Sequence, residues 1–214
     1  MKNAAAPPYI DQNLNLLLGR GGMNPIEPAI SAKLDLYLSL ILRWNARMNL
    51  TAVRDPAGIV SRHFFESIAC TQLLPTEIST LLDFGSGAGF PGIPIALCRP
   101  EIAVTLAESQ AKKAAFLQET VRSLELNCQV WPKRAEQLGQ QFDCVTLRAV
   151  DQMGRAVKTA TKLIKLNGTL AVLTTQAAYP EMQMSAGEEF QWAKPFCIPG
   201  SEQRLIALGN KVAD

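Results

Sequence analysis

Paired cysteines, long apolar runs and a strong excess of either charge are all absent from this 214-residue chain. Its five cysteines form no C-x-x-C pair, so nothing supports a zinc ribbon or a thioredoxin-like redox site, and reduced, buried thiols are expected. The N-terminus lacks an apolar core of signal-peptide length, and no stretch approaches membrane-spanning length. We therefore expect a cytoplasmic protein with no bound metal and no membrane contact. The cysteines are Cys70, Cys98, Cys128, Cys144 and Cys197.

Charge and size narrow the class of protein only in part. Lys and Arg number 21 and Asp and Glu 19, and the resulting net charge of +2 neither demands nor excludes a nucleic-acid partner. A hydrophobic content of 48% with 19% charged residues is typical of a globular protein. The length fits one α/β domain with an extension better than two domains.

A glycine cluster at residues 85–92 is the feature around which the rest of the chain can be arranged. An apolar run enters it at Leu81 and Leu82, and a second apolar run follows it, which indicates a buried strand, a tight loop and a helix. Gly85, Gly87 and Gly89 can adopt positive φ and let a ligand approach bare backbone. The helix start beyond them offers free N–H groups. The cluster therefore predicts a site for a nucleotide-like ligand.

The glycine spacing favours one kind of cofactor. In the dinucleotide pattern G-x-G-x-x-G, counted from Gly85, the third glycine would fall at position 90, which is Phe90. This favours a ligand without a pyrophosphate, such as S-adenosylmethionine. A plain glycine-rich turn, an NAD(P)-dependent oxidoreductase and a non-catalytic Rossmann-like binding module are the alternatives.

The order of apolar patterns predicts the fold class. Residues 1–78 show helical spacing and form an N-terminal helical extension, in which Asp55-Pro56 is a helix start. Residues 79–214 alternate strands and helices, which predicts one compact α/β unit with a mostly parallel, seven-stranded, Rossmann-like sheet and helices on both faces. A helical stripe is expected from Met153 to Ile164, followed by a turn at Asn167-Gly168. Beyond the strand at 81–84, strands are expected at 102–106, 128–131, 142–147, 169–174, 191–198 and 204–208.

Three polar positions follow predicted strands, at the edge of the sheet where such folds bind ligands. Glu108 ends the second strand and can accept both ribose hydroxyls of an adenosine; the alternative is a solvated helix cap. Ala135-Glu136 follows the third strand and can address an adenine edge, although Glu136 fits a surface charge equally well. Arg148 ends the fourth strand, where a guanidinium is costly to desolvate without a partner.

Several motifs occur in order along the chain: Asn49–Pro56, Arg62-His63 with Glu66-Ser67, Gly85–Gly92, Arg99-Pro100, Glu108, Lys112–Leu117, Arg134–Glu136 and Arg148-Ala149. In these motifs the chain resembles the glucose-inhibited division protein B family, the guanine-N7 methyltransferases of small-subunit ribosomal RNA. The resemblance covers residues 30–150 strongly and the tail weakly.

The resemblance implies an S-adenosylmethionine-dependent methyltransferase fold and a 16S ribosomal RNA or 30S subunit substrate. It implies a catalytic role for Arg148 beside the methyl-transfer centre. We also expect a monomer. The implied S-adenosylmethionine contacts are Gly85, Gly87, Phe90, Glu108, Ala135, Glu136 and Arg148.

Two departures from the family pattern affect the substrate side. Leu147 stands where the family often has Ser, and Gln176 lies in a stretch where the family usually carries Lys-Gly after the fifth strand. If that lysine grips RNA, this chain binds its substrate differently. Neither change touches the expected cofactor site.

The missing catalytic groups agree with guanine N7 as the acceptor. N7 carries a lone pair and no proton, so its methylation needs no general base and can rest on positioning. No Asn/Asp-Pro-Pro-Tyr/Phe motif follows the fourth strand, as exocyclic-amine enzymes show, and no Pro-Cys pair exists for cytosine C5 chemistry.

Contact with RNA is expected from the helical extension. Arg54 and Arg62 fall on and between its helices, where they would face phosphates. His63, the only histidine, is a candidate RNA contact, and a neutral side chain packed inside the extension is the alternative.

Overall fold

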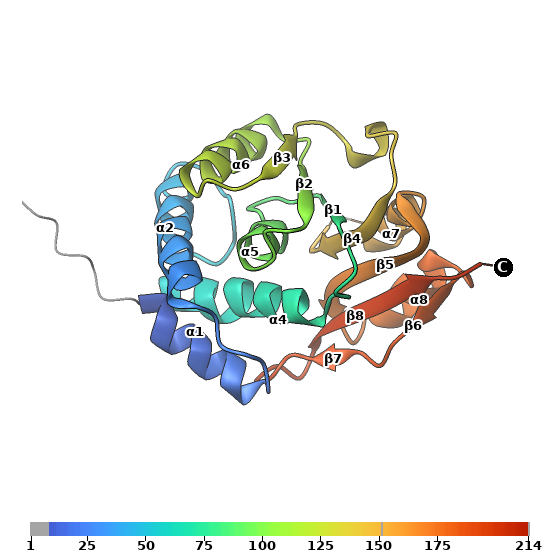
Figure 1. Cartoon of the computed structure of the whole chain (residues 1–214), viewed down its shortest axis with the longest axis horizontal. Coiled ribbons are helices and arrows are strands. Elements are labelled where there is room, and N and C mark those ends of the chain that lie inside the picture. Colours follow the sequence, from blue (N-terminus) through green and yellow to red (C-terminus); the bar gives the residue numbers. More distant parts are fainter. Residues whose placement is uncertain (1–8, 151, 214) are drawn as a thin grey trace, which may run out of the picture.

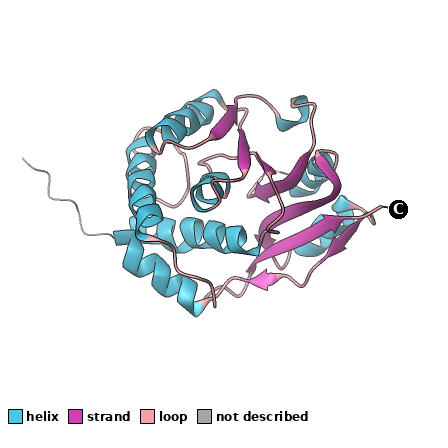
Figure 2. Ribbon diagram, viewed as in Figure 1, coloured by secondary structure: helices cyan, strands magenta, loops and turns pink. Residues whose placement is uncertain are grey.

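The computed structural model describes residues 9–150 and 152–213, and within them eight strands form one sheet. The strand order is β3-β2-β1-β4-β5-β8-β6, with β7 also paired to β8 (Figures 1 and 2). Neighbours from β3 to β5 are parallel, whereas β8 is antiparallel to β5, β6 and β7. The predicted class, a mostly parallel Rossmann-like α/β sheet, is confirmed. The strands are β1 Thr80–Phe84, β2 Ala103–Ala107, β3 Cys128–Trp131, β4 Phe142–Arg148, β5 Ile164–Thr175, β6 Phe190–Trp192, β7 Phe196–Cys197 and β8 Arg204–Lys211.

Helices cover both faces of the sheet, and each face has its own apolar core. One core joins the sheet to the N-terminal helices, α5 and α6, and it includes Leu34, Phe64, Leu81 and Phe116. The other joins the sheet to α7 and α8. The helices are α1 Tyr9–Arg20, α2 Pro28–Asn45, α3 Pro56–Gly58, the π-helix η1 Ile59–Phe64, α4 Phe65–Leu73, α5 Gly92–Cys98, α6 Ala111–Ser123, the 3-10 helix η2 Ala135–Gln137, α7 Met153–Thr161 and α8 Tyr179–Ala186.

The helical extension packs as part of this body. Figure 1 shows α1, α2 and α4 along one side of the molecule, with α2 reaching α6. Lys33 Nζ donates to the Leu124 carbonyl at 2.9 Å, and Trp44 Nε1 donates to Glu119 at 3.0 Å, which ties α2 to the end and the middle of α6. No strand precedes Thr80 among residues 9–79. The division of the chain at residue 78 stays a prediction.

A capped, irregular helix runs from α3 through η1 into α4. Asp55 caps its start by accepting the Gly58 N–H at 2.6 Å, with Pro56 in the first turn, as the sequence predicts. The Phe65 N–H then bonds to the Val60 carbonyl, five residues back, which is the wider turn of a π-helix. This turn carries His63 and leads directly to Glu66.

The strand count differs from the predicted seven because Pro195 interrupts the expected strand 191–198. The interruption splits it into β6 and β7, since proline has no N–H to donate to a ladder. β5 occupies one edge of β8, and β6 and β7 therefore share the other.

Two other local predictions are wrong. Ile164 does not continue α7, because it pairs with Phe142 and begins β5. Asn167-Gly168 does not precede β5 but lies within it, where the register against β4 shifts and Asn167 has a φ of 63°. Helix α8 was not foreseen.

Candidate functional site

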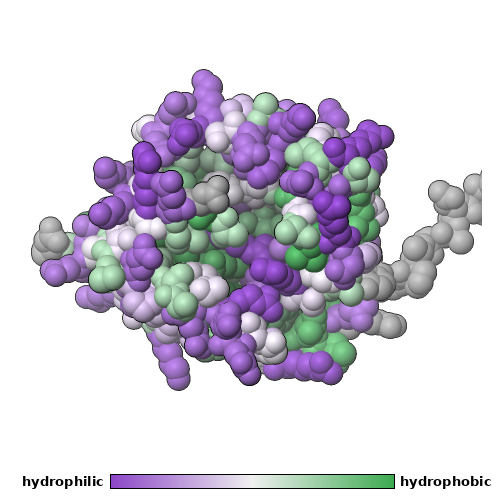
Figure 3. All heavy atoms as spheres, turned by 180° about the vertical axis from the view of Figure 1, so that it is seen from behind, coloured by the Kyte–Doolittle hydropathy of each residue, from purple (hydrophilic) through white to green (hydrophobic). Residues whose placement is uncertain are grey.

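A cleft of about 900 Å³ opens at the carboxyl ends of the parallel strands. β1 lies between β2 and β4, so successive connections leave β1 in opposite directions, which is where open α/β sheets bind ligands. The face shown in Figure 3 is hollowed near its centre, and both hydrophilic and hydrophobic residues border the hollow.

The glycine loop forms the floor of the cleft between β1 and α5. Gly85 and Gly87 line it with φ values of 71° and 57°, which side chains rarely allow. The Ser86 N–H bonds to the Ala107 carbonyl at 3.0 Å, tying the loop to the end of β2. The loop is therefore fixed, with backbone exposed to a ligand.

Asp83 holds the loop from beneath. Its Oδ2 accepts the Gly92 N–H at 3.2 Å, and its Oδ1 accepts the Thr146 hydroxyl at 2.8 Å. The carboxyl is buried, and this burial raises its pKa to about 6. A Cβ at Gly92 would lie 2.7 Å from Asp83 Oδ2, so only glycine permits this approach.

Glu108 stands beside the loop with part of its hydrogen-bonding capacity unused. Oε2 accepts the Gly87 N–H at 3.0 Å, and Oε1 accepts the Gln110 N–H at 2.7 Å. Each carboxylate oxygen has a further lone pair, so the side chain can accept two more hydrogens, one per oxygen. Two adjacent ribose hydroxyls fit this arrangement. Glu108 thus caps the start of α6, which was the alternative role, and it also keeps two acceptor positions free.

Ala135 and Glu136 lie on η2 and line the same cleft as Glu108. Ala135 is buried, and the Glu136 side chain is exposed at the rim. Trp131 Nε1 donates to the Arg134 carbonyl at 3.1 Å, which holds the turn between β3 and η2.

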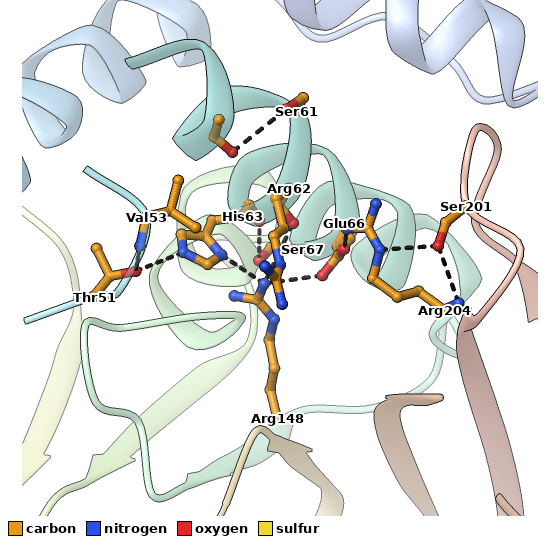
Figure 4. Close-up of polar contacts among 11 residues, drawn as sticks. Thr51, Val53, Ser61, Arg62, His63, Glu66, Ser67, Arg148, Ser201 and Arg204 are labelled. Atoms are coloured by element: carbon orange, nitrogen blue, oxygen red, sulfur yellow. Dashed lines mark hydrogen bonds and ion pairs between the residues drawn. The ribbon is translucent and has the colours of Figure 1, made fainter. Parts of the chain in front are cut away.

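Arg148, at the end of β4, has a side chain that is only 10% exposed and contacts three residues of the helical extension (Figure 4). Its Nη2 lies 2.9 Å from Glu66 Oε2 and 2.6 Å from His63 Nδ1, and it also donates to the Arg62 carbonyl at 3.3 Å. The guanidinium carbon is 5.6 Å from the centre of the Phe90 ring. Burial lowers the pKa of Arg148 from its ordinary value, and Glu66 opposes that shift.

Glu66 is shared between two arginines. Its other oxygen, Oε1, accepts from Arg204, which is also bonded to Ser201 through Nε at 3.1 Å (Figure 4). Arg204 lies on β8 opposite Thr175 at the end of β5. The positively charged Arg204 therefore lies beside the end of β5, where the Lys-Gly expected from the sequence resemblance is absent.

His63 is buried with both ring nitrogens engaged. Nδ1 faces Arg148, and Nε2 is 2.7 Å from Thr51 Oγ1. Burial, followed by the charges of Arg148, Arg62 and Arg204, lowers its pKa to about 3, so the ring is neutral at pH 7.

The chain is strained directly after Arg148. Ala149 has a φ of 49°, a conformation that costs a non-glycine residue about 1–3 kcal/mol. Ala149 and Val150 line the cleft. Such strain at the end of a strand is typical of functional sites.

The structure brings together most of the residues that the sequence singled out. All of the expected cofactor contacts line the cleft, together with Arg62 and His63. Arg54 lies outside the lining and bonds to Asn49 at 2.8 Å. Arg204 and Asp83 were missed, and Glu66 and Thr51 were noted only inside motifs. An acidic residue inside an apolar run that leads into the glycine cluster is a signal that could have identified Asp83, whereas no local pattern could identify Arg204.

In the described part of the chain, all five cysteines are free thiols and no three His, Cys, Asp or Glu side chains are grouped to hold a metal ion. Burial raises the thiol pKa of Cys98 and of Cys128 to about 12. None of the helices in that part is both long and apolar enough to cross a membrane.

Comparisons with known proteins agree on one family. A family model described as rRNA small subunit methyltransferase G (GidB) matches residues 30–199. The ribosomal RNA small subunit methyltransferase G of Xanthomonas euvesicatoria is 38% identical, covering 97% of this chain and 99% of that protein. The protein of the same name from Stenotrophomonas maltophilia is 37% identical, covering 86% and 88%.

Solved structures share the fold at low identity. The N-methyltransferase NodS from Bradyrhizobium japonicum, in complex with S-adenosyl-L-homocysteine, matches with a TM-score of 0.58 and 16% identity, covering 82% of this chain and 97% of that one. An S-adenosylmethionine-dependent O-methyltransferase from Thermotoga maritima matches with a TM-score of 0.58 and 14% identity, covering 70% and 65%.

Proposed function

The chain belongs to the GidB family, as the resemblance in its sequence predicted, and is an S-adenosylmethionine-dependent methyltransferase; we propose that it methylates N7 of one guanine in small-subunit ribosomal RNA. The relatives named above support this substrate. The NAD(P)-dependent oxidoreductase and the non-catalytic binding module, which the sequence left open, are not supported.

The observation that carries the proposal is the pairing of Glu108 with the glycine loop. Both Glu108 oxygens are oriented by backbone N–H groups and keep one acceptor position each, beside Gly85 and Gly87. We assign the ribose to Glu108, the adenine to the wall of Ala135 and Glu136, and the methionine end to Gly85, Gly87 and Phe90. S-adenosylmethionine, when bound, supplies an electrophilic methyl group on a sulfonium.

Arg148 is the residue that we place beside the reacting atoms. The N7 lone pair forms the new carbon–nitrogen bond as the sulfur–methyl bond breaks, and no proton has to leave N7. The chain's part is to fix the base near the methyl group and to keep water away. Arg148, at the end of β4, lies against the Phe90 ring and is held by Glu66. It can therefore contact one side of the guanine as the base approaches the methyl group.

Arg54 and Arg62 supply the proposed phosphate contacts. Arg62 is exposed at the cleft, and Arg54 is exposed on the loop before α3, so both are accessible to phosphates. His63 uses both nitrogens within the protein, so its part in RNA binding is through its neighbours. The substrate is 16S rRNA or the 30S subunit. The cytoplasmic location and the monomeric state stay predictions.

One experiment tests the function directly. Purified protein is incubated with unmodified small subunits and a labelled methyl donor, and the product base is mapped by mass spectrometry and by cleavage at 7-methylguanine. Methyl transfer to N7 of a single guanine is expected. Label on an exocyclic amine, on cytosine or on no RNA would contradict the proposal.

A further inference from the structure

Thr51 stands on the cleft wall, on a loop held in place by Asn45. The Asn45 Oδ1 accepts the N–H groups of Leu50 at 2.9 Å and Thr51 at 3.0 Å, and its Nδ2 donates to the Val53 carbonyl at 3.3 Å. The Thr51 side chain lines the cleft and reaches His63 (Figure 4). Thr51 is therefore held at the cleft in a fixed position, with its hydroxyl next to His63.

The chemistry of Arg148 decides which His63 nitrogen carries the proton. A guanidinium can only donate, so His63 Nδ1, 2.6 Å from Arg148 Nη2, must accept. A ring with a lone pair on Nδ1 carries its proton on Nε2. Nε2 therefore donates to Thr51 Oγ1 across 2.7 Å.

Both acceptor positions of the Thr51 hydroxyl are then filled. Besides the His63 proton, Oγ1 accepts the Val53 N–H at 3.2 Å. A hydroxyl has two acceptor lone pairs and one hydrogen to donate. Within residues 9–150 and 152–213, neither of its bonds uses that hydrogen. The chain from Glu66 through Arg148 and His63 thus makes Thr51 a group that can only donate toward the cleft.

A donor at this place distinguishes guanine from adenine. Guanine presents two acceptors on its N7 edge, N7 and O6, whereas adenine presents N7 and an amino group. N7 needs its lone pair for the incoming methyl group, which leaves O6 as the acceptor. Building on the proposed function, we propose that Thr51 donates a hydrogen bond to O6 of the target guanine. Thr51 sets base specificity, and His63 and Asn45 are positioning residues.

A substrate that lacks O6 isolates this contact. The mapped guanine is replaced in reconstituted small subunits by 2-aminopurine, which keeps N7 and the 2-amino group but has hydrogen at position 6. Thr51→Val is expected to lower kcat/KM on guanine by roughly 10- to 100-fold, the loss of one discriminating hydrogen bond. On 2-aminopurine, wild type and Thr51→Val should agree within about threefold, because the contact is already gone.

Thr51→Ser, which keeps the hydroxyl, should restore activity on guanine to within about threefold of wild type. Titration with S-adenosylhomocysteine shows that each variant is folded and keeps its cofactor site. An equal loss on both bases, or no rescue by serine, overturns the inference while leaving the proposed function intact. Absence of any N7 methylation by the wild type defeats the proposed function itself, and the two failures are thus distinguishable.

Discussion

At the scale of single residues, the site depends on carboxylates whose oxygens are each used for a separate purpose. Glu108 accepts a backbone N–H of the glycine loop and is proposed to bind the ribose, and Glu66 joins two arginines from β4 and β8. Both are buried, so neither charge is well screened by water. Removing one charge at either position should therefore have a large and specific effect.

Glu108→Gln is predicted to weaken S-adenosylhomocysteine binding by roughly 10- to 100-fold, since one of two charged acceptors is lost. Isothermal titration measures the change. Glu101→Gln, which removes the same charge from an exposed side chain outside the cleft, should leave affinity unchanged. Equal affinities for Glu108→Gln and wild type would rule out the assigned ribose contact.

Glu66→Gln is predicted to lower the free energy of unfolding by about 3 kcal/mol, because it leaves two neighbouring guanidinium groups without a counter-charge. The side chains of Glu66 and Arg148 are 6% and 10% exposed, so water cannot replace the lost partner. Urea unfolding measures the loss. The matched control is again Glu101→Gln: it breaks a pair in which Glu101 is 56% exposed, and it should cost about 0–1 kcal/mol.

At the scale of elements, the loop between α2 and α3 is held largely by side-chain hydrogen bonds. It has no ladder partners, and Asn45 supplies three of its hydrogen bonds. Asn45→Ala is predicted to speed amide hydrogen exchange at Thr51 by about fivefold, because one such bond is worth about 1 kcal/mol. Exchange at Leu50 should rise less, because its N–H also bonds to the Met48 carbonyl at 2.9 Å. Exchange followed by mass spectrometry or NMR measures this. Asn49→Ala, which loses only the contact with Arg54, should leave both amides protected.

Helix α2 shows what sequence patterns could and could not predict. The helical spacing over residues 1–78 predicted helices in this part of the chain, and in α2 the structure buries an apolar stripe at Leu34, Leu38 and Ile41. The spacing alone does not indicate where the helix stops, which is at Asn45. The Asn45 side chain accepts two backbone N–H groups from the following loop, and a periodicity of apolar residues contains no sign of this.

The candidate site also has parts that the sequence could predict and parts that it could not. The glycine loop and Glu108 were predictable because each follows a strand by one to a few residues, and strand ends of one direction share an edge. The pairing of Glu66 with Arg204 joins residues 138 positions apart and depends on the antiparallel placement of β8. The π-helical turn that carries His63 closes a hydrogen bond over five residues instead of four, which the helical spacing of the sequence did not predict.

At the scale of the whole molecule, binding to the RNA should follow the distribution of charge. Arg54→Glu and Arg62→Glu are each predicted to weaken binding to unmodified small subunits and to reduce the slope of log affinity against log salt by about 1. Lys162→Glu makes the same charge change on an exposed residue just before β5, at the opposite end of that strand from the cleft, and should change neither. Equal salt slopes for all four proteins would reject the phosphate contacts.

Folding stability should depend on pH through two buried groups of the site, whose contributions change with pH in opposite directions. Burial raises the pKa of Asp83 from 3.8 to about 6, so the folded state holds that proton more tightly. Its stabilisation is complete below pH 3.8 and is lost as pH rises through 6. Burial and then Arg148 lower the pKa of His63 from 6.5 to about 3. Its contribution is complete above pH 6.5 and is lost as pH falls toward 3.

Between pH 4 and 6 these two contributions oppose each other in the wild type, and single substitutions should expose each one. Asp83→Asn removes the falling contribution, so its free energy of unfolding should rise with pH more steeply than that of the wild type, by up to about 1.4 kcal/mol per pH unit. His63→Asn should rise less steeply, by a similar amount. Urea unfolding at pH 4, 5, 6 and 7 measures the slopes, and groups common to all three proteins cancel in the differences. Parallel curves would mean that neither group is held in its buried, neutral form by the fold. Slopes that diverge in the stated directions would show that burying Asp83 beneath the glycine loop lowers stability as the pH rises toward neutral. They would also show that burying His63 beside Arg148 lowers stability as the pH falls into the acid range.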